Sequence, residues 1–274
     1  MLEAQWDKGN FVCVGLDSDF SKIPESVREK VTNAKSMRGD AVVAFNRAIV
    51  EETHDLVCAY KPNIAFYEAQ GAEGVEALQR TISDIHAIAP DVPVIIDAKR
   101  ADIGNTNAGY VDAVFGFLQA DAITVHPYLG AEALQPFLSI TNKGVIVLCR
   151  TSNPGAGEFQ DLSVNGEPLY RLVARQVANK WNKNGNCALV VGATYPNELR
   201  EVRRIVGDMP ILIPGIGKQG GVVEDTVKAG KDSRGRGMAI NSSRGIIFAS
   251  SGADFAKVAR SKTEELRNLI NQYR

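Results

Sequence analysis

The sequence predicts an α/β protein with the fold of a (β/α)8 TIM barrel, in a single domain spanning residues 1–274. Short apolar runs alternate strictly with longer helix-like segments, and eight such pairs can be counted along the chain. The runs are almost continuously apolar, which is typical of parallel strands that are buried on both faces. A length of 274 residues without a mid-chain linker suits one barrel, and an open doubly wound sheet is the alternative.

The predicted strands are runs of Val, Ile, Leu, Ala and Cys that are too short for buried helices. In chain order they cover residues 11–16, 57–60, 92–96, 122–125, 145–149, 188–191, 211–213 and 238–240.

The predicted helices are longer segments whose apolar residues recur on one face, as Val43, Ile49 and Val50 do in the first of them. They cover residues 40–54, 71–89, 105–118, 131–138, 168–181, 197–206, 222–229 and 254–273. Residues 18–39 form a long connection, and the polar, Gly-rich residues 228–237 predict a loop or a frayed helix end.

Composition is typical of a globular protein. Apolar residues make up 45% and charged residues 23%, with a formal net charge of −1 and no basic stripe, which argues against a nucleic-acid partner. No run approaches the roughly 20 apolar residues that span a bilayer, and residues 1–10 do not resemble a signal peptide. The four cysteines lie in apolar runs without metal-site spacing, which predicts buried thiols and a cytoplasmic location.

Charged and polar residues follow most of the predicted strands, where the carboxyl ends of barrel strands form the mouth that holds active sites. Buried charges are costly unless they are paired, so this clustering indicates a functional site. The residues are Asp17, Lys61, Asp97, Lys99, His126, Thr151, Ser152, Thr194 and Arg244.

Residues 97–106 are the densest part of this pattern. Strand alternation places Asp97 and Lys99 on one side, and Asp102 follows at the strand–helix turn. Asp102 as an ordinary helix N-cap is one alternative. A magnesium site is another, but the lysines at 61 and 99 would repel the cation, so we expect no metal.

Residues 214–221 and 241–245 predict a phosphate-binding site. Glycines such as Gly215 and Gly217, after Pro214, let backbone N–H groups approach an anion, and Arg244 offers a bidentate fork. Loops after the seventh and eighth strands commonly bind phosphate in barrels. A simple Gly-rich turn is the alternative interpretation.

These motifs together resemble the orotidine 5′-phosphate decarboxylase family. Residues 97–106 are similar to its D-x-K-R-x-D-I-x-x-T signature, and residues 14–17 resemble its first-strand motif. Residues 60–68, 191–194, 214–221 and 241–245 resemble its longer bacterial branch. The resemblance covers nearly the whole barrel.

The resemblance implies a cofactor-free decarboxylation of orotidine 5′-phosphate to uridine 5′-phosphate, the last step of UMP synthesis. It implies a homodimer in which Lys61, Asp97 and Lys99 meet the partner's Asp102, with Ile103 and Thr106 also reaching the partner's site. Lys99 would stabilise and protonate the C6 carbanion. The implied substrate-binding residues are Asp17 for the ribose, Ser152 for the pyrimidine, Gln219 for base and phosphate, and Pro214, Gly215, Gly217 and Arg244 around the phosphate.

Two other functions are open from the residues alone. One is a metal-dependent sugar-phosphate lyase or synthase on the same barrel, which the absence of metal-ligand spacing disfavours. The other is a non-catalytic barrel that binds a phosphate ligand, which would not need the charge alternation of Asp97, Lys99 and Asp102.

Overall fold

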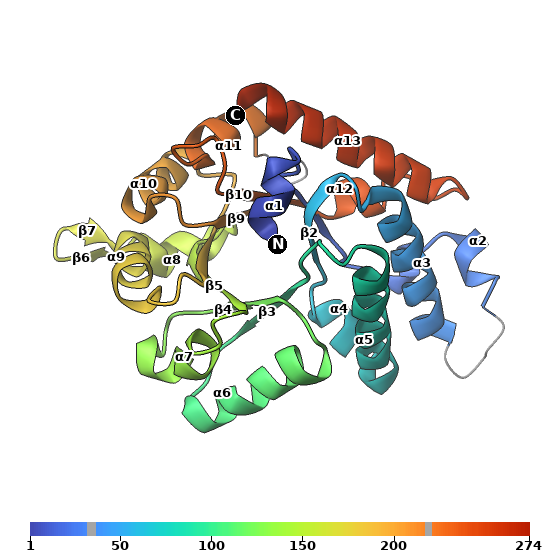
Figure 1. Ribbon diagram of the computed structural model, residues 1–274, viewed down its shortest axis with the longest axis horizontal. Coiled ribbons are helices and arrows are strands. Elements are labelled where there is room, and N and C mark those ends of the chain that lie inside the picture. Colours follow the sequence, from blue (N-terminus) through green and yellow to red (C-terminus); the bar gives the residue numbers. More distant parts are fainter. Residues whose placement is uncertain (32–36, 217–220) are drawn as a thin grey trace. The chain divides into compact units, whose positions relative to one another are not determined.

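The computed structural model describes residues 1–31, 37–216 and 221–274 and confirms the predicted (β/α)8 barrel (Figure 1). Among the described residues, eight barrel strands alternate with helices along the chain. They are β1 (Val12–Gly15), β2 (Val57–Lys61), β3 (Ile95–Arg100), β4 (Ala122–Val125), β5 (Gly144–Arg150), β8 (Cys187–Val191), β9 (Ile211–Pro214) and β10 (Met238–Ser242).

The α-helices are α1 (Leu2–Asp7), α2 (Glu25–Arg28), α3 (Met37–Thr53), α4 (Ala65–Glu68), α5 (Gly71–Ile88), α6 (Gly104–Val111), α7 (Gly130–Leu138), α8 (Gly157–Gln160), α9 (Leu169–Gln176), α10 (Pro196–Val206), α11 (Val223–Gly230), α12 (Arg244–Ile247) and α13 (Phe255–Tyr273). Short π-helical segments, Asp112–Phe117 and Val177–Trp181, continue α6 and α9. Single 3-10 turns form at Phe20–Lys22 and Pro154–Ala156.

The described residues group into two compact units. The first contains Met1–Ala98, Phe117–Ala120 and Ser242–Asn268, and the second contains Lys99–Gly116, Asp121–Asn241 and Leu269–Arg274.

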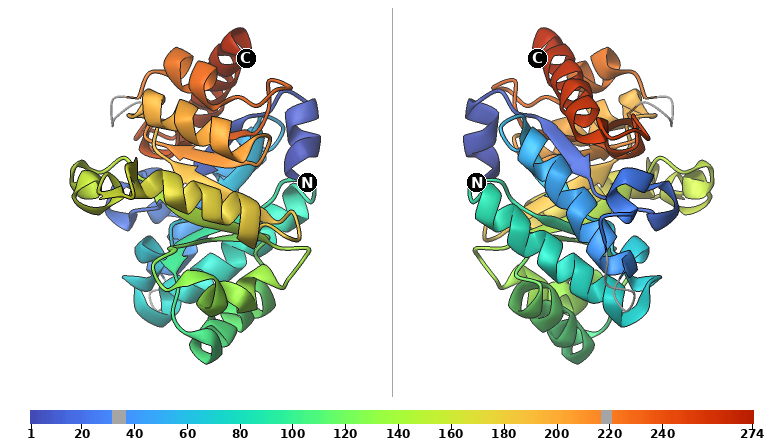
Figure 2. Two further views of the ribbon diagram at one scale, coloured as in Figure 1. Left: turned by 90° about the vertical axis from the view of Figure 1, so that its left-hand side faces the viewer. Right: turned by 90° about the vertical axis from the view of Figure 1, so that its right-hand side faces the viewer.

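In the first unit, β1 pairs with β2 in parallel, and a backbone bridge between Asn63 and Asp97 sets β3 beside the end of β2. The helices α3 and α5 pack side by side (Figures 1 and 2). Phe45 of α3 stacks on Phe248 and Phe255, with ring centroids 5.4 and 5.0 Å apart. Apolar burial of this kind is the main stabilising contribution to the core.

In the second unit, β4, β5, β8, β9 and β10 pair in parallel in that order. A bulge interrupts the register of β5 and β8 between Leu148 and Arg150. The helix α10 packs against α11, and α6 packs against α7 (Figure 1). After β5 the chain makes an excursion through α8 and a two-stranded hairpin, β6 (Ser163–Val164) and β7 (Glu167–Pro168).

The third predicted strand, residues 92–96, is displaced in the structure. The strand β3 begins at Ile95 and runs to Arg100, so Asp97 and Lys99 lie within it rather than after it. Lys99 has a φ of 49°, so the simple alternation of strand side chains does not extend through this residue. The predicted buried thiols are confirmed, since all four cysteines are free and buried.

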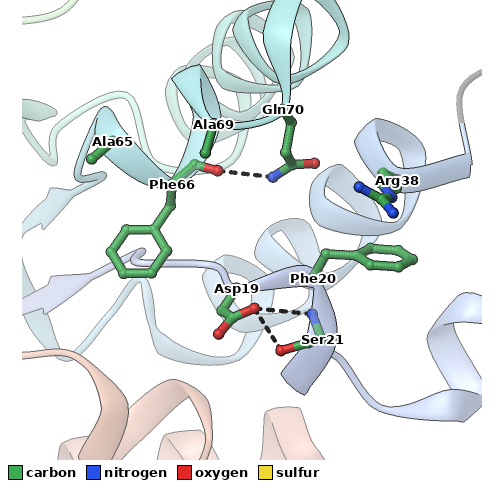
Figure 3. A pocket seen from close by; sticks show the side chains of 8 residues that line it. All are labelled: Asp19, Phe20, Ser21, Arg38, Ala65, Phe66, Ala69 and Gln70. Atoms are coloured by element: carbon green, nitrogen blue, oxygen red, sulfur yellow. Dashed lines mark hydrogen bonds between the residues drawn. The ribbon is translucent and has the colours of Figure 1, made fainter.

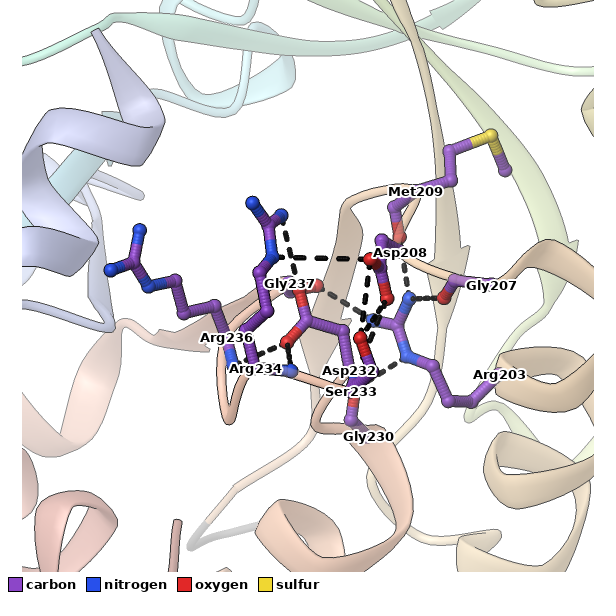
Figure 4. A network of polar contacts seen from close by, with 10 residues as sticks. All are labelled: Arg203, Gly207, Asp208, Met209, Gly230, Asp232, Ser233, Arg234, Arg236 and Gly237. Atoms are coloured by element: carbon purple, nitrogen blue, oxygen red, sulfur yellow. Dashed lines mark hydrogen bonds and ion pairs between the residues drawn. The ribbon is translucent and has the colours of Figure 1, made fainter.

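A buried arginine connects the segments that precede β9 and β10 (Figure 4). Arg203 of α10 donates from Nε to the Gly230 carbonyl at 2.8 Å and from Nη2 to the Gly237 carbonyl at 2.8 Å. Its Nη1 donates to the carbonyls of Gly207 and Met209 at 2.7 and 2.6 Å. Burial lowers the pKa of the guanidinium to about 10, which still leaves it charged at neutral pH.

Replacing Arg203 with Gln should lower the free energy of unfolding by about 3 kcal/mol, because several buried carbonyls lose their donor at once. Urea unfolding followed by circular dichroism measures the loss. Arg200→Gln on the exposed face of the same helix is the matched control and should change stability by less than about 0.5 kcal/mol. Equal effects of the two substitutions would contradict the anchoring role of Arg203.

Candidate active site

A buried ion pair occupies the carboxyl end of β2 in the first unit. The Nζ atom of Lys61 lies 2.9 Å from Oδ2 of Asp97, and their side chains are only 5% and 11% exposed. Asn63 also directs its side-chain amide towards Oδ2 of Asp97 at 3.5 Å. The structure therefore brings together two of the four residues predicted to be catalytic.

The charge state of Lys61 follows from a balance of burial and nearby carboxylates. Burial alone disfavours the ammonium, but Asp97 and Asp17 favour it, and the net effect raises the pKa of Lys61 above its ordinary value. Cys13 lies in the same electrostatic environment, and burial raises the pKa of its thiol to about 12. Lys61 is therefore a cation and Cys13 a neutral thiol at physiological pH.

Some polar atoms near strand ends are buried without a hydrogen-bond partner among the described residues. Oδ1 of Asp17, Oγ1 of Thr194 and Oδ1 of Asn241 are among them. Buried polar groups are nearly always satisfied in folded proteins, so each of these atoms could form a hydrogen bond with a ligand. Asn241 was not among the predicted site residues, although its position in the segment 241–245 was a usable signal.

Lys99 lies in the second unit, where a hydrogen bond fixes its backbone. Its N–H group donates to Oγ1 of Thr124 at 3.0 Å, a contact between β3 and the neighbouring β4. The Lys99 residue is exposed in the chain described here. The hydrogen bond thus fixes the main chain of Lys99 beside β4.

The turn that contains Asp102 is organised by a residue that the sequence analysis overlooked. Asn107 is fully buried, accepts from the Asp102 N–H at 2.9 Å, and donates to the carbonyls of Asp102 and Ala133 at 2.5 and 2.6 Å. The Asp102 carboxylate accepts from the N–H of Ile103 at 2.7 Å, and α6 starts without a side-chain cap. The N-cap alternative for Asp102 is therefore wrong.

The segment that carries Arg244 is attached to the end of β1. Oγ of Ser243 donates to the Gly15 carbonyl at 3.1 Å. A Cβ atom on Gly15 would lie 2.7 Å from Cβ of Ser243, so only glycine permits this close approach. The contact places the exposed Arg244, the first residue of α12, beside the strand end that precedes Asp17.

The predicted phosphate loop is described only at its two ends. The Pro214 carbonyl accepts from the Ala193 N–H at 2.8 Å, and Gly215 has a φ of 105° and accepts from the Gly221 N–H at 3.1 Å. Gly217 and Gln219 lie outside the described residues.

Ser152 follows β5 and touches the neighbouring strand end closely. A Cβ atom on Gly192 would lie 2.7 Å from Cβ of Ser152 and 2.9 Å from its backbone nitrogen. Glycine at position 192 thus lets the Ser152 segment approach the main chain after β8.

A cavity of about 480 Å³ opens in the first unit beside the segments that follow β1 and β2 (Figure 3). It combines the rings of Phe20 and Phe66 with polar side chains, and the Arg38 guanidinium lies 5.5 Å from the centre of the Phe20 ring. Its lining residues are Asp19, Phe20, Ser21, Arg38, Ala65, Phe66, Ala69 and Gln70. None of the predicted site residues lines this cavity.

Within residues 1–31, 37–216 and 221–274, no group of three or more His, Cys, Asp or Glu side chains could hold a metal ion. The same residues include no helix with the length and apolar character needed to cross a membrane.

Eight parallel strands that alternate with helices along the chain, together with the buried Lys61–Asp97 pair at the carboxyl end of β2, are typical of a (β/α)8-barrel enzyme. The family model for the orotidine 5′-phosphate decarboxylase / HUMPS family matches residues 11–258. The chain belongs to this family.

Named relatives and solved structures agree with this assignment. An orotidine 5′-phosphate decarboxylase of Ralstonia nicotianae is 51% identical over all of this chain and 97% of its own length. That of Cellvibrio japonicus is 49% identical over 98% of this chain and 96% of its own length. The structure of Leishmania donovani OMP decarboxylase is 37% identical, with a TM-score of 0.82 and coverage of 98% of this chain and 97% of that one.

Replacing Asp97 with Asn should lower the free energy of unfolding by about 3 kcal/mol, because it leaves the buried ammonium of Lys61 without its closest counter-charge. Urea unfolding measures the change. Asp84→Asn, which breaks an exposed ion pair with Arg47, is the control and should cost at most about 1 kcal/mol.

The double variant Lys61→Met with Asp97→Leu removes both charges and should regain most of the stability that the single variant loses. An Asp97→Asn protein as stable as wild type would contradict the proposed dependence of Lys61 on Asp97.

Proposed function

We propose that this protein catalyses the decarboxylation of orotidine 5′-phosphate to uridine 5′-phosphate and carbon dioxide, the last step of UMP synthesis, in one domain spanning residues 1–274. The observation that carries the proposal is the buried ion pair between Lys61 of β2 and Asp97 of β3, the strand that also bears Lys99. Family membership over residues 11–258 supplies the substrate class.

The main requirement of this reaction is electrostatic stabilisation of the carbanion that forms at C6. Loss of carbon dioxide from C6 leaves an electron pair in an sp2 orbital outside the pyrimidine π system, where the ring offers no resonance sink. A fixed cation near C6 can stabilise this charge as it develops, and preorganised charges in a site that excludes water contribute several kcal/mol by typical estimates. We assign this role to the Lys99 ammonium, which then protonates C6 as a general acid.

Carboxylates next to Lys99 favour its protonated form and fix its position. We assign this role to Asp97, which Lys61 holds, and to Asp102 from the second subunit of a homodimer. Ile103 is 56% exposed, and on the family resemblance we assign this apolar side chain to contacts with the partner. Thr106, which is exposed in the first turn of α6, would also reach the partner's site.

The substrate's remaining groups fit the other strand ends. Asp17, with one unpartnered carboxylate oxygen, would accept hydrogen bonds from the ribose hydroxyls. Arg244 and the backbone around Gly215 would bind the phosphate, with Pro214 shaping the loop. Ser152 would contact the pyrimidine. The roles proposed for Gly217 in phosphate binding and Gln219 in bridging base and phosphate come from the resemblance alone.

The proposed reaction uses neither a cofactor nor a metal ion, because Lys99 supplies both the stabilising charge and the proton. The four free thiols support a location in the reducing cytoplasm.

Lys99→Ala should lower kcat at least about a thousandfold, because the variant loses both the stabilising charge and the proton donor. The loss of orotidine 5′-phosphate absorbance measures turnover, and unchanged circular dichroism would show that the fold survives. Lys262→Ala, which removes an exposed lysine from α13, is the matched control and should retain full activity.

Near-normal turnover of the Lys99→Ala variant would contradict the role of Lys99 as the general acid. Wild-type activity should also persist in EDTA, and a metal requirement would favour the sugar-phosphate lyase instead.

Arg244→Ala should raise the KM for orotidine 5′-phosphate roughly 10–100-fold, because a charge-assisted contact to the phosphate is lost. Affinity for the phosphate-free nucleoside, measured by competition, should stay nearly constant. Arg47→Ala, at an exposed site on α3, should change neither value. A similar loss for both ligands would contradict the phosphate role.

A further inference from the structure

Arg150, the last residue of β5, is a buried charged residue for which the proposed reaction has no direct use. It is only 3% exposed, although arginine is rarely buried without a reason. Its Nη2 donates to Oδ2 of Asp161 at 3.0 Å, and its Nε lies 2.9 Å from Oδ1 of the same carboxylate. The guanidinium also lies 4.0 Å from the centre of the Tyr195 ring.

These contacts join three segments of the second unit. Arg150 belongs to the end of β5, Asp161 to the excursion between β5 and α9, and Tyr195 to the segment after β8. A planar guanidinium is suited to this task because its edge binds a carboxylate while its face stacks on an aromatic ring. The energy of burying the charge is thus offset by contacts that fix the three segments together.

The segment fixed most directly is the one that contains Ser152. Nη1 of Arg150 donates to the Thr151 carbonyl at 2.8 Å, and the Thr151 N–H donates to Oε1 of Gln160 at 2.8 Å. Both backbone groups of Thr151 are therefore bound. On the other side, Gly192 has no Cβ atom, which allows the main chain after β8 to lie close to Ser152.

We propose that Arg150 and Asp161 are positioning residues that hold Ser152 against the pyrimidine of the substrate and so determine selectivity for the base. This inference rests on the proposed function, because that function assigns Ser152 to the base. Supporting contacts of this kind fix the position of a ligand-binding side chain. Small displacements of such a side chain reduce ligand affinity and turnover.

Asp161→Asn is the most informative variant, because the Asp161 side chain is 45% exposed and its replacement retains the shape while removing the charge. Glu167→Gln is the matched control. Glu167 lies on the same excursion and forms an ion pair with Arg175, without contact to Arg150.

Calorimetric titration with two probes, uridine 5′-phosphate and ribose 5-phosphate, separates base recognition from phosphate recognition. Asp161→Asn should weaken binding of uridine 5′-phosphate about tenfold, the scale of one lost charge-assisted contact, and change binding of ribose 5-phosphate less than about twofold. Glu167→Gln should leave both affinities within about twofold of wild type. Gln160→Met, which removes the acceptor for the Thr151 N–H, should reproduce the Asp161→Asn pattern.

A double-mutant cycle with Ser152→Ala tests whether the effect passes through Ser152. In that background, Asp161→Asn should add less than about threefold to the loss of uridine 5′-phosphate affinity. Full additivity, equal losses for the two probes, or no loss in Asp161→Asn would each overturn the inference. A wild-type protein that neither binds uridine 5′-phosphate nor consumes orotidine 5′-phosphate would instead overturn the proposed function.

Discussion

The buried ammonium of Lys61 constrains the first unit, because a charge in that position requires a counter-charge within reach. Asp97 supplies it at 2.9 Å. The same residue is fixed through its backbone, since its N–H donates to the Pro62 carbonyl and its carbonyl accepts from the Ile64 N–H. The ion pair and the backbone bridge therefore fix the register between the end of β2 and β3.

The strand–helix alternation could be predicted because buried parallel strands and amphipathic helices leave strong apolar patterns. The limits of β3 could not be predicted from the apolar pattern. Polar residues from Asp97 onwards interrupt the apolar run, but the backbone continues as a strand. Short elements such as α1 and the β6–β7 hairpin were also missed. Their stability depends on tertiary contacts, such as the stacking of Trp6 on Phe11, rather than on a local period.

The candidate site was predictable in outline for a similar reason. Charged residues adjoining apolar runs are unusual enough to be noticed, and Lys61 and Asp97 do pair. The supporting residues were not predictable, because Asn107 and Arg150 act through contacts with residues distant in the sequence. An asparagine inside a helix or an arginine after a strand gives no local sign that its side chain is buried.

The backbone of Lys99 has a further consequence for attempts to make the protein more heat-resistant. A φ of 49° costs a residue with a side chain about 1 kcal/mol, whereas glycine adopts it freely. Exchange for glycine would relieve this strain and remove the amine at the same time. Screens that select variants only for a higher melting temperature would therefore favour a variant that lacks the amine to which we assign proton donation, so backbone strain has to be relieved elsewhere in the chain.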